Sequence, residues 1–441
     1  MSLRVAAVQT PGAALHAWRD TLALLESRIA DAAGRGAELV VLPECAFPAY
    51  VLGSAEAYWA ARGAGLPAPD VTLLPLRDWA RQLRVGLCIG HVAERGQTLL
   101  NAATLIDATD RICGTHHKAF LWDFDHDYFA AGEELRPIDT PWGRIGVMIC
   151  ADARLPEIAA TLVTRGAELL LQPTAWVNVG TADAPWNPQP EFLIAARAEE
   201  FAVPVVSASK YGVEAGTGFV GGAVICDATG RIVARLADAS ASMVLADVTP
   251  APGRRPVMTR GEHIRLVSTI PPFPPPANVA RVQFSVDDDG RIVLTLPRQY
   301  LSTPLDSAGL SGGQLGGERR LRRTIGKACF IHGPAEEMHG FATARCAALG
   351  EPIPTVIDGL AGAHFIAVYG DGASEQLLRT RALENRVFVV QSAGGELRVW
   401  GPDGRRLTSQ PPDVRLALAA NKQVARGTDV LADRRPEMYE F

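Results

Sequence analysis

The chain has 441 residues, of which 48% are hydrophobic, enough to fill two ordinary cores. Its formal net charge is −5 and it has no basic stripe, which argues against nucleic acid and membrane as partners. No apolar run approaches the roughly 18 residues of a membrane span, and no signal-peptide pattern opens the chain. Seven scattered cysteines without metal-ligand spacing favour reduced thiols. We therefore expect a cytoplasmic protein without a metal or an organic cofactor.

Short apolar runs alternate with helical patterns through the first half of the chain, which predicts an α/β fold with mixed sheets. The predicted strands are 3–10, 37–43, 85–94, 99–107, 144–150, 167–173 and 203–209, with a hairpin over 218–236. The predicted helices are 17–33, 74–83, 156–166 and 191–202.

Two breaks follow, a proline-rich stretch at 270–279 and a glycine-rich stretch at 307–317. Beyond them, three segments resemble segments of the first half and follow one another in the same order. The matching pairs are 197–208 with 381–392, 227–233 with 401–407, and 253–258 with 433–438. We expect a first domain over 1–265, a connecting segment with a hairpin pattern over 266–319, and a shortened, degenerate repeat over 320–441.

A cysteine stands at the end of the apolar run "RIGVMIC", directly before a turn. From the end of a strand, Cys150 could project its sulfur out of the sheet, and the backbone N–H of Ala151 could face a developing oxyanion. A lone cysteine after an apolar run is more often a structural thiol, so other groups have to support a catalytic role.

Two further polar residues stand at such ends. Glu44 closes "VVLPE", where burial would raise the pKa of its carboxyl and suit it to act as a base. Lys118 follows the next pair of strands. It is one of only four lysines in the chain, so a lysine within a structured segment indicates a specific role. In the order Glu, Lys, Cys, the three residues form a more specific pattern than any one alone.

The chain from 1 to about 260 resembles the nitrilase superfamily of carbon–nitrogen hydrolases, on the segments "AVQT", "LPE", "HHKAFL" and "CADARLPE". The resemblance implies an α-β-β-α sandwich in which Cys150 is the nucleophile, Glu44 the base and Lys118 the cation beside the oxyanion. It also implies a fourth acidic residue, usually glutamate, seven positions before a glycine. Counting back from Gly132 gives Asp125, whose side chain is one methylene shorter.

A calcium loop is the alternative explanation of the aspartates at 123, 125 and 127. It requires glycine at its sixth position, where this chain has Tyr128, so we expect no metal site there. No signature of a papain-like or caspase-like protease surrounds Cys150.

The residues after the cysteine indicate the substrate. Nitrile-hydrolysing members typically have Trp-Glu there, whereas this chain has Ala-Asp, as amide- and carbamoyl-hydrolysing members do. We therefore expect hydrolysis of a small-molecule linear amide or N-carbamoyl compound through a cysteine thioester. The alternatives are nitrile hydrolysis and a catalytically silent binding or scaffold protein. Trp176, Tyr50 and Trp122 are the expected substrate contacts, although each has an equally good explanation as a packing aromatic.

The repeat is expected to be non-catalytic. Aligning "GVMIC" with "GKACF" places Phe330 at the nucleophile position and Cys329 one residue early, on the opposite face of a strand. Members of the resembled family commonly pair two sandwiches, so we expect the part from about 320 onward to pack on the first domain as an internal pseudo-partner. A homo-oligomer is the alternative.

Overall fold

The computed structural model describes residues 2–236, 242–257, 363–408 and 417–441, and short segments between 260 and 362 and at 413–415. The chain divides into two contact units. The first contains Met1–Pro256 together with Ala425–Thr428 and Met438–Phe441, and the second contains Val257–Val424 and Asp429–Glu437. The predicted domain limits at 265 and 320 stay predictions, but two short C-terminal segments belong to the first unit rather than to the second.

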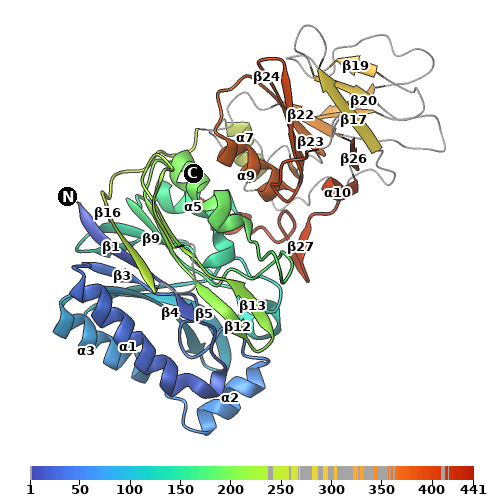
Figure 1. Ribbon diagram of the computed structural model, residues 1–441. Helices are drawn as coiled ribbons and strands as arrows, with labels where there is room; N and C mark the ends of the chain where they lie inside the picture. Colours follow the sequence, from blue (N-terminus) through green and yellow to red (C-terminus); the bar gives the residue numbers. More distant parts are fainter. Residues whose placement is uncertain are drawn as a thin grey trace. The chain divides into compact units, whose positions relative to one another are not determined.

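In the first unit two mixed sheets pack face to face, and helices cover the outer face of each (Figure 1). This arrangement is the expected α-β-β-α sandwich. The first sheet has the order β16-β1-β3-β4-β5-β6, with β7 paired to β5. Its strands are β1 Leu3–Val8, β3 Leu39–Val41, β4 Gly86–Arg95, β5 Thr98–Ile106, β6 Ile112–His117, β7 Phe129–Ala130 and β16 Met243–Val248.

The second sheet has the order β15-β14-β11-β10-β9-β8. Its strands are β8 Ile138–Thr140, β9 Gly143–Val147, β10 Leu169–Pro173, β11 Val205–Ala208, β14 Ala223–Cys226 and β15 Ile232–Leu236. The outer helices are α1 Trp18–Gly34 and α3 Pro69–Leu83 on the first sheet, and α5 Pro156–Thr164 and α6 Ile194–Phe201 on the second. A further helix is α2 Ala55–Gly63. The central strands are buried along their whole length, as expected for strands covered on both faces.

Two local expectations differ from the structure. The strand predicted to reach Cys150 ends at Val147, because the chain leaves the sheet in a turn that exposes the cysteine to the site. The hairpin predicted over 218–236 begins only at Ala223, since Gly221 and Gly222 both have positive φ and break the run. The residues before this break, β13 Thr217–Val220, instead pair with β12 Lys210–Glu214, and β12 also pairs with β2 Thr10–Pro11.

In the second unit, a six-stranded sheet has the order β20-β21-β22-β23-β24-β25, and β17, β18, β19 and β26 form a smaller antiparallel sheet. The larger sheet has strands β20 Leu321–Ile325, β21 Ala328–Ile331, β22 Ala342–Arg345, β23 Phe365–Tyr369, β24 Phe388–Ala393 and β25 Glu396–Trp400. The smaller one has β17 Arg281–Val286, β18 Ile292–Thr295, β19 Ser302–Pro304 and β26 Asp413–Arg415. Helix α9 Glu375–Asn385 packs on β24, and the remaining described elements of this unit include α7 Arg260–Leu266 and α10 Ala417–Ala420.

The strand directions correct one sequence alignment. From β21 to β25 the sheet repeats the order antiparallel, parallel, parallel, antiparallel that runs from β8 through β9, β10 and β11 to β14. The strand at the place of the cysteine strand β9 is therefore β22, not β21, on which the alignment had placed Cys329 and Phe330. The side chains of those two residues lie outside the described part of the chain.

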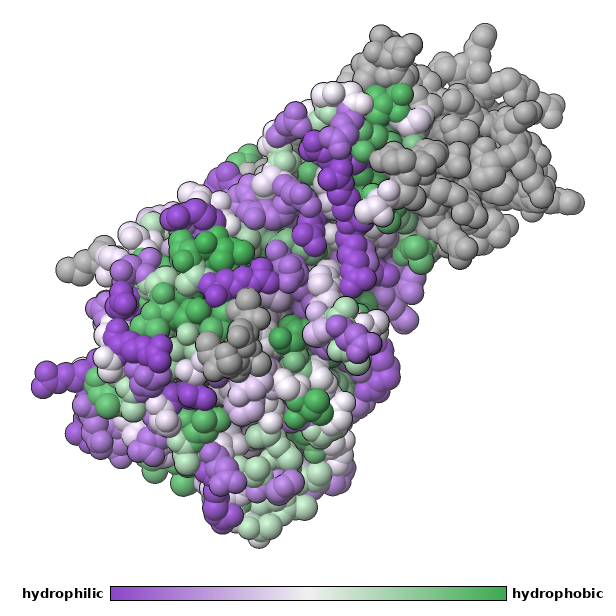
Figure 2. Space-filling model, viewed as in Figure 1, coloured by the Kyte–Doolittle hydropathy of each residue, from purple (hydrophilic) through white to green (hydrophobic). Residues whose placement is uncertain are grey.

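Hydrophilic and hydrophobic residues are interspersed on the face of the described chain drawn in Figure 2. Within the described residues, no helix is long and apolar enough to cross a membrane.

Candidate active site

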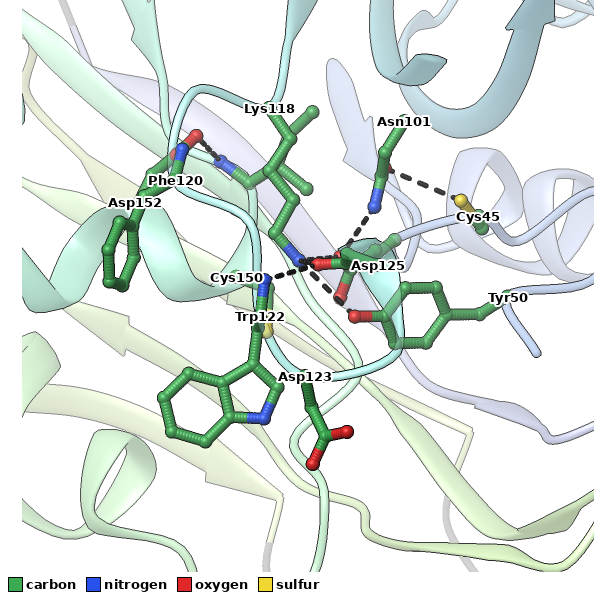
Figure 3. Close-up of polar contacts among 12 residues, drawn as sticks. Cys45, Tyr50, Asn101, Lys118, Phe120, Trp122, Asp123, Asp125, Cys150 and Asp152 are labelled. Atoms are coloured by element: carbon green, nitrogen blue, oxygen red, sulfur yellow. Dashed lines mark hydrogen bonds and ion pairs between the residues drawn. The ribbon is translucent and has the colours of Figure 1, made fainter. Parts of the chain in front are cut away.

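The predicted acidic, basic and sulfur groups come together at strand ends of the first unit (Figure 3). Glu44 lies just past β3, Lys118 directly follows β6, and Cys150 follows β9. Asp125 begins the short helix α4 Asp125–Tyr128. Glu44, Lys118 and Asp125 are fully buried, and Cys150 is 6% exposed. Strand ends from both sheets and the start of α4 thus bring residues distant in sequence into one enclosed cluster.

The ammonium group of Lys118 lies at the centre of this cluster. Its Nζ donates to Glu44 Oε1 at 2.7 Å, to Asp125 Oδ2 at 2.6 Å and to the hydroxyl of Tyr50 at 3.2 Å. Burial lowers the pKa of Lys118, but the charges of Asp125 and Glu44 oppose burial and the net pKa lies well above its ordinary value. Lys118 therefore stays charged, and the shorter side chain of Asp125 does reach it.

Each of the two carboxylates keeps one oxygen open. Glu44 Oε1 accepts from Lys118 and from Asn101 Nδ2 at 2.8 Å, whereas Glu44 Oε2 has no hydrogen-bond partner among the described residues. Asp125 Oδ2 accepts from Lys118 and from the backbone N–H of Trp122 at 2.9 Å, and Oδ1 likewise has no partner in the described chain. Burial raises the pKa of Glu44 above its ordinary 4.5, although Lys118 acts against it. An open oxygen on a carboxylate of raised pKa is suited to accept a proton.

Cys150 is held in a left-handed backbone conformation, with φ of 46°, which is uncommon for a residue other than glycine. The side chain of Gln172, on β10, donates from Nε2 to the carbonyl oxygen of Cys150 at 2.9 Å. Gln172 is in turn fixed by Ser207, whose hydroxyl donates to its Oε1 at 2.7 Å. The neighbouring strands thus support the turn that presents the sulfur.

Burial raises the pKa of the Cys150 thiol to about 12, and the Glu44 charge raises it further, while the Lys118 charge lowers it. The sulfur is therefore a neutral thiol near pH 7. It needs a base before it can attack, and a carboxylate with an open oxygen belongs to the same cluster.

Asp152, the acidic residue of the Cys-x-Asp pattern, ties the cysteine turn to the lysine segment. Its Oδ1 accepts the backbone N–H groups of Ala119 and Phe120 at 3.0 and 2.8 Å. Its Oδ2 accepts the N–H of Ile149 at 2.9 Å and lies 3.1 Å from His116 Nε2. Asp152 therefore fixes the chain directly before Cys150 against the chain directly after Lys118.

The aromatic residues expected at the substrate are all buried. Tyr50 bonds to Lys118, and the ring of Trp122 lies under the guanidinium of Arg154, 4.2 Å from its carbon to the ring centroid. Trp176 is fully buried, and its indole N–H has no partner among the described residues. Ala151 is in the turn that begins at Cys150. Contact of these four residues with substrate stays a prediction.

Asp123 and Asp127, which the sequence offered as ligands of a calcium loop, are bound by an arginine. Arg426 Nη1 and Nη2 donate to the two carboxylate oxygens of Asp127 at 3.1 and 2.5 Å, and its Nε donates to Asp123 at 3.3 Å. No group of three metal-binding side chains occurs in the described parts of the chain.

Sequence reasoning missed Asn101 and Gln172, which orient Glu44 and Cys150. Each is a fully buried amide in the middle of an apolar strand segment, "LLNAA" and "LLLQP". A polar side chain is rarely buried without a partner, and that is the signal that could have identified them.

Comparison with known proteins shows the family of the chain. Residues 4–254 match the carbon-nitrogen hydrolase family. The omega-amidase NIT2 of Danio rerio is 30% identical over 216 residues, 47% of this chain and 73% of that protein. The deaminated glutathione amidase of Yersinia enterocolitica is 29% identical over 271 residues, 58% of this chain and 91% of that protein. A solved carbon-nitrogen hydrolase from Helicobacter pylori G27 has a similar fold, with a TM-score of 0.51 and 20% identity over 56% of this chain and 89% of that one.

Proposed function

Because the chain belongs to the carbon–nitrogen hydrolase family and is a hydrolase of the amidase type, we propose that it cleaves a linear amide or an N-carbamoyl compound with Cys150 as nucleophile. The observation that supports these residue roles is that the two carboxylate oxygens of Glu44 have different surroundings. One oxygen holds Lys118, and the other is open to take the thiol proton.

In the first half of the reaction, Glu44 Oε2 accepts the proton of Cys150 and the sulfur attacks the carbonyl carbon. The developing oxyanion is stabilised by Lys118 and by the N–H of Ala151. The Lys118–Tyr50 hydrogen bond, at 3.2 Å, is the longest of the three that the ammonium makes, so this donor is the one that turns to the oxyanion. The C–N bond then breaks, Glu44 passes its proton to the nitrogen, and ammonia or an amine leaves.

The second half hydrolyses the thioester. Glu44 removes a proton from water, the hydroxyl adds to the acyl carbon, and the C–S bond breaks as the sulfur regains its proton. The sum is amide plus water giving acid plus ammonia or amine, with the enzyme restored. Asp125 holds the ammonium of Lys118 together with Glu44 through both halves.

Amides are favoured over nitriles for two reasons. Ala151 and Asp152 stand where nitrile-hydrolysing members of the resembled family have Trp-Glu, and both relatives reported above are named as amidases. A panel of linear amides, N-carbamoyl amino acids and aryl nitriles tests this choice by ammonia release. Faster turnover of nitriles than of amides would reverse it.

Replacement of the nucleophile separates the enzyme from a silent scaffold of the same fold. Cys150→Ala is expected to lower kcat by about a thousandfold or more without loss of folding. Cys226→Ala is the matched control, because Cys226 is also buried but lies on β14. A trapped substrate should add its acyl mass to Cys150 and not to Cys113, which is more exposed. Unchanged turnover by Cys150→Ala would refute the assignment.

A further inference from the structure

A turn near the C-terminal end of the chain touches the segment that carries Asp125. Residues Ala425–Thr428 belong to the first unit and form the tip between β27 Gln423–Ala425 and β28 Thr428–Asp429. Their partners are Asp123, His126 and Asp127, which surround Asp125 in the sequence. The contacts cross about 300 residues of chain, since Arg426 and Asp127 are separated by 299 positions.

Thr428 supplies the buried half of this contact. It is fully buried, and its Oγ1 accepts the backbone N–H of Asp123 at 3.0 Å and lies 3.4 Å from His126 Nε2. Asp123 has a φ of 46°, in the left-handed region that costs energy for a residue with a Cβ. The hydrogen bond that its N–H donates to the buried Thr428 hydroxyl helps to hold this conformation.

Arg426 supplies the exposed half. Its guanidinium donates hydrogen bonds to both carboxylate oxygens of Asp127 and to the carboxylate of Asp123. It therefore binds two residues that lie on either side of Asp125 in the sequence. Two-oxygen pairing fixes orientation as well as distance, because the guanidinium and the carboxylate are both planar. The Arg426 side chain is 61% exposed, so salt will weaken this part of the contact.

The segment between these anchors is the one that orients the site. Asp125 Oδ2 accepts from Lys118 and from the N–H of Trp122, and the Asp125 N–H donates to the carbonyl of Trp122 at 2.9 Å. A shift of Asp123 or Asp127 therefore moves the carboxylate that holds Lys118 in place.

We propose that Thr428 and Arg426 are positioning residues of the amide-hydrolysing site, which act by holding the Asp123–Asp127 segment so that Asp125 keeps Lys118 aligned. The proposal rests on the function proposed above. It gives the C-terminal tip a direct part in turnover, distinct from any general contribution to folding.

Steady-state kinetics of the full chain with a hydrolysed linear amide tests this. Thr428→Val, which keeps the shape and removes the acceptor, should lower kcat about tenfold, and Thr428→Ser should restore it. Arg426→Ala should lower kcat about threefold, in keeping with an exposed ion pair, with less effect on KM. Arg426→Ala combined with Asp127→Asn should be no slower than the slower single variant, because both remove the same contact.

Two controls remove a similar interaction elsewhere in the fold. Arg81→Ala removes an exposed arginine that forms ion pairs with Asp78 and Asp110. Thr72→Val removes a buried hydroxyl that donates a hydrogen bond to the carbonyl of Ala68. Both controls should keep wild-type kcat. Rising salt should bring the wild type towards the kcat of Arg426→Ala and leave Arg426→Ala itself less affected.

The proposal is overturned if Thr428→Val and Arg426→Ala keep wild-type kcat, or if they lose activity only in proportion to their unfolded fraction in thermal melts. These outcomes are distinct from a failure of the proposed function. If the proposed function were wrong, Cys150→Ala itself would still turn over substrate, whatever the result at Thr428 and Arg426.

Discussion

At the scale of single residues, the site depends on a lysine that is charged although it is fully buried. Removing one partner from a buried ion pair leaves the other charge uncompensated, which is costly. Lys118 has two carboxylate partners, and each also binds a second donor, Asn101 for Glu44 and the backbone of Trp122 for Asp125. The two carboxylates thus share one cation while keeping one open oxygen each.

We predict that Asp125→Asn lowers kcat by about a hundredfold or more, since an amide keeps the shape but loses the charge that holds Lys118. The measurement is kcat with a linear amide, alongside a thermal melt to show that the variant folds. Asp123→Asn is the control, because the Asp123 carboxylate faces Arg426 rather than Lys118. A larger loss in Asp123→Asn than in Asp125→Asn would show that the count from Gly132 chose the wrong residue.

The pH profile reports on Glu44. Its pKa is raised above 4.5 mainly by burial, and the base form is the one that accepts the thiol proton. Activity is therefore lost as pH falls through this raised pKa, so the acid limb of kcat/KM should have an apparent pKa above that of an ordinary glutamate. Circular dichroism over the same pH range checks that the limb is not acid unfolding. An acid limb at or below 4.5 would contradict the assignment of Glu44 as base.

At the scale of elements, β3, β6 and β9 end shortly before Glu44, Lys118 and Cys150, and other elements fix the segments that follow these strands. The hairpin of β12 and β13, absent from the sequence-based expectations, has such a role. On β12, Glu214 accepts the backbone N–H groups of Tyr50 and Val51 with one oxygen and Lys210 Nζ with the other, at 2.7 Å. The loop that carries the Tyr50 hydroxyl to Lys118 is thus fixed to a strand of a different sheet.

The prediction at this scale concerns the hydrogen bond that supports the turn at Cys150. Gln172→Leu removes the donor to the Cys150 carbonyl and leaves buried polar atoms unpaired, which should lower the free energy of unfolding by about 1–3 kcal/mol. Since the cysteine turn has positive φ and depends on this support, kcat should fall by about tenfold or more. Denaturant titration and steady-state kinetics measure the two effects. Gln82→Leu, at an exposed position on α3, is the control, and a Gln172→Leu enzyme with wild-type kcat would show that the turn supports itself.

At the scale of the whole molecule, α6 and α9 share details that an internal repeat would explain. A buried arginine pairs with a glutamate three residues later in both helices, Arg197 with Glu200 and Arg381 with Glu384. Both helices also end at a left-handed residue, with φ of 51° at Ala202 and 50° at Arg386. The internal repeat itself and the absence of catalysis from the second unit stay predictions.

A chain that ends near residue 265 tests the part of the molecule beyond the first sandwich. It lacks the tip at 425–428 and also Glu440, which pairs with Arg165 at 2.7 Å and bonds through its N–H to Thr161 on α5. We predict a lower thermal midpoint and a lower kcat than in the full chain, as expected if the later part acts as an internal pseudo-partner. A shortened chain that is soluble, equally stable and fully active would instead show an independent appendage.

The sequence by itself determined the α/β alternation, the sandwich implied by the family resemblance, and the positions of Glu44, Lys118 and Cys150. It could do so because an apolar run followed by a polar residue is a local pattern, legible wherever a buried strand ends. The tertiary structure alone decided which oxygen of Glu44 is open, that Asn101 and Gln172 donate hydrogen bonds to Glu44 and Cys150, and that Arg426 binds Asp123 and Asp127. Those facts depend on contacts between residues far apart in the chain, which strand pairing and packing bring together and which no local pattern records.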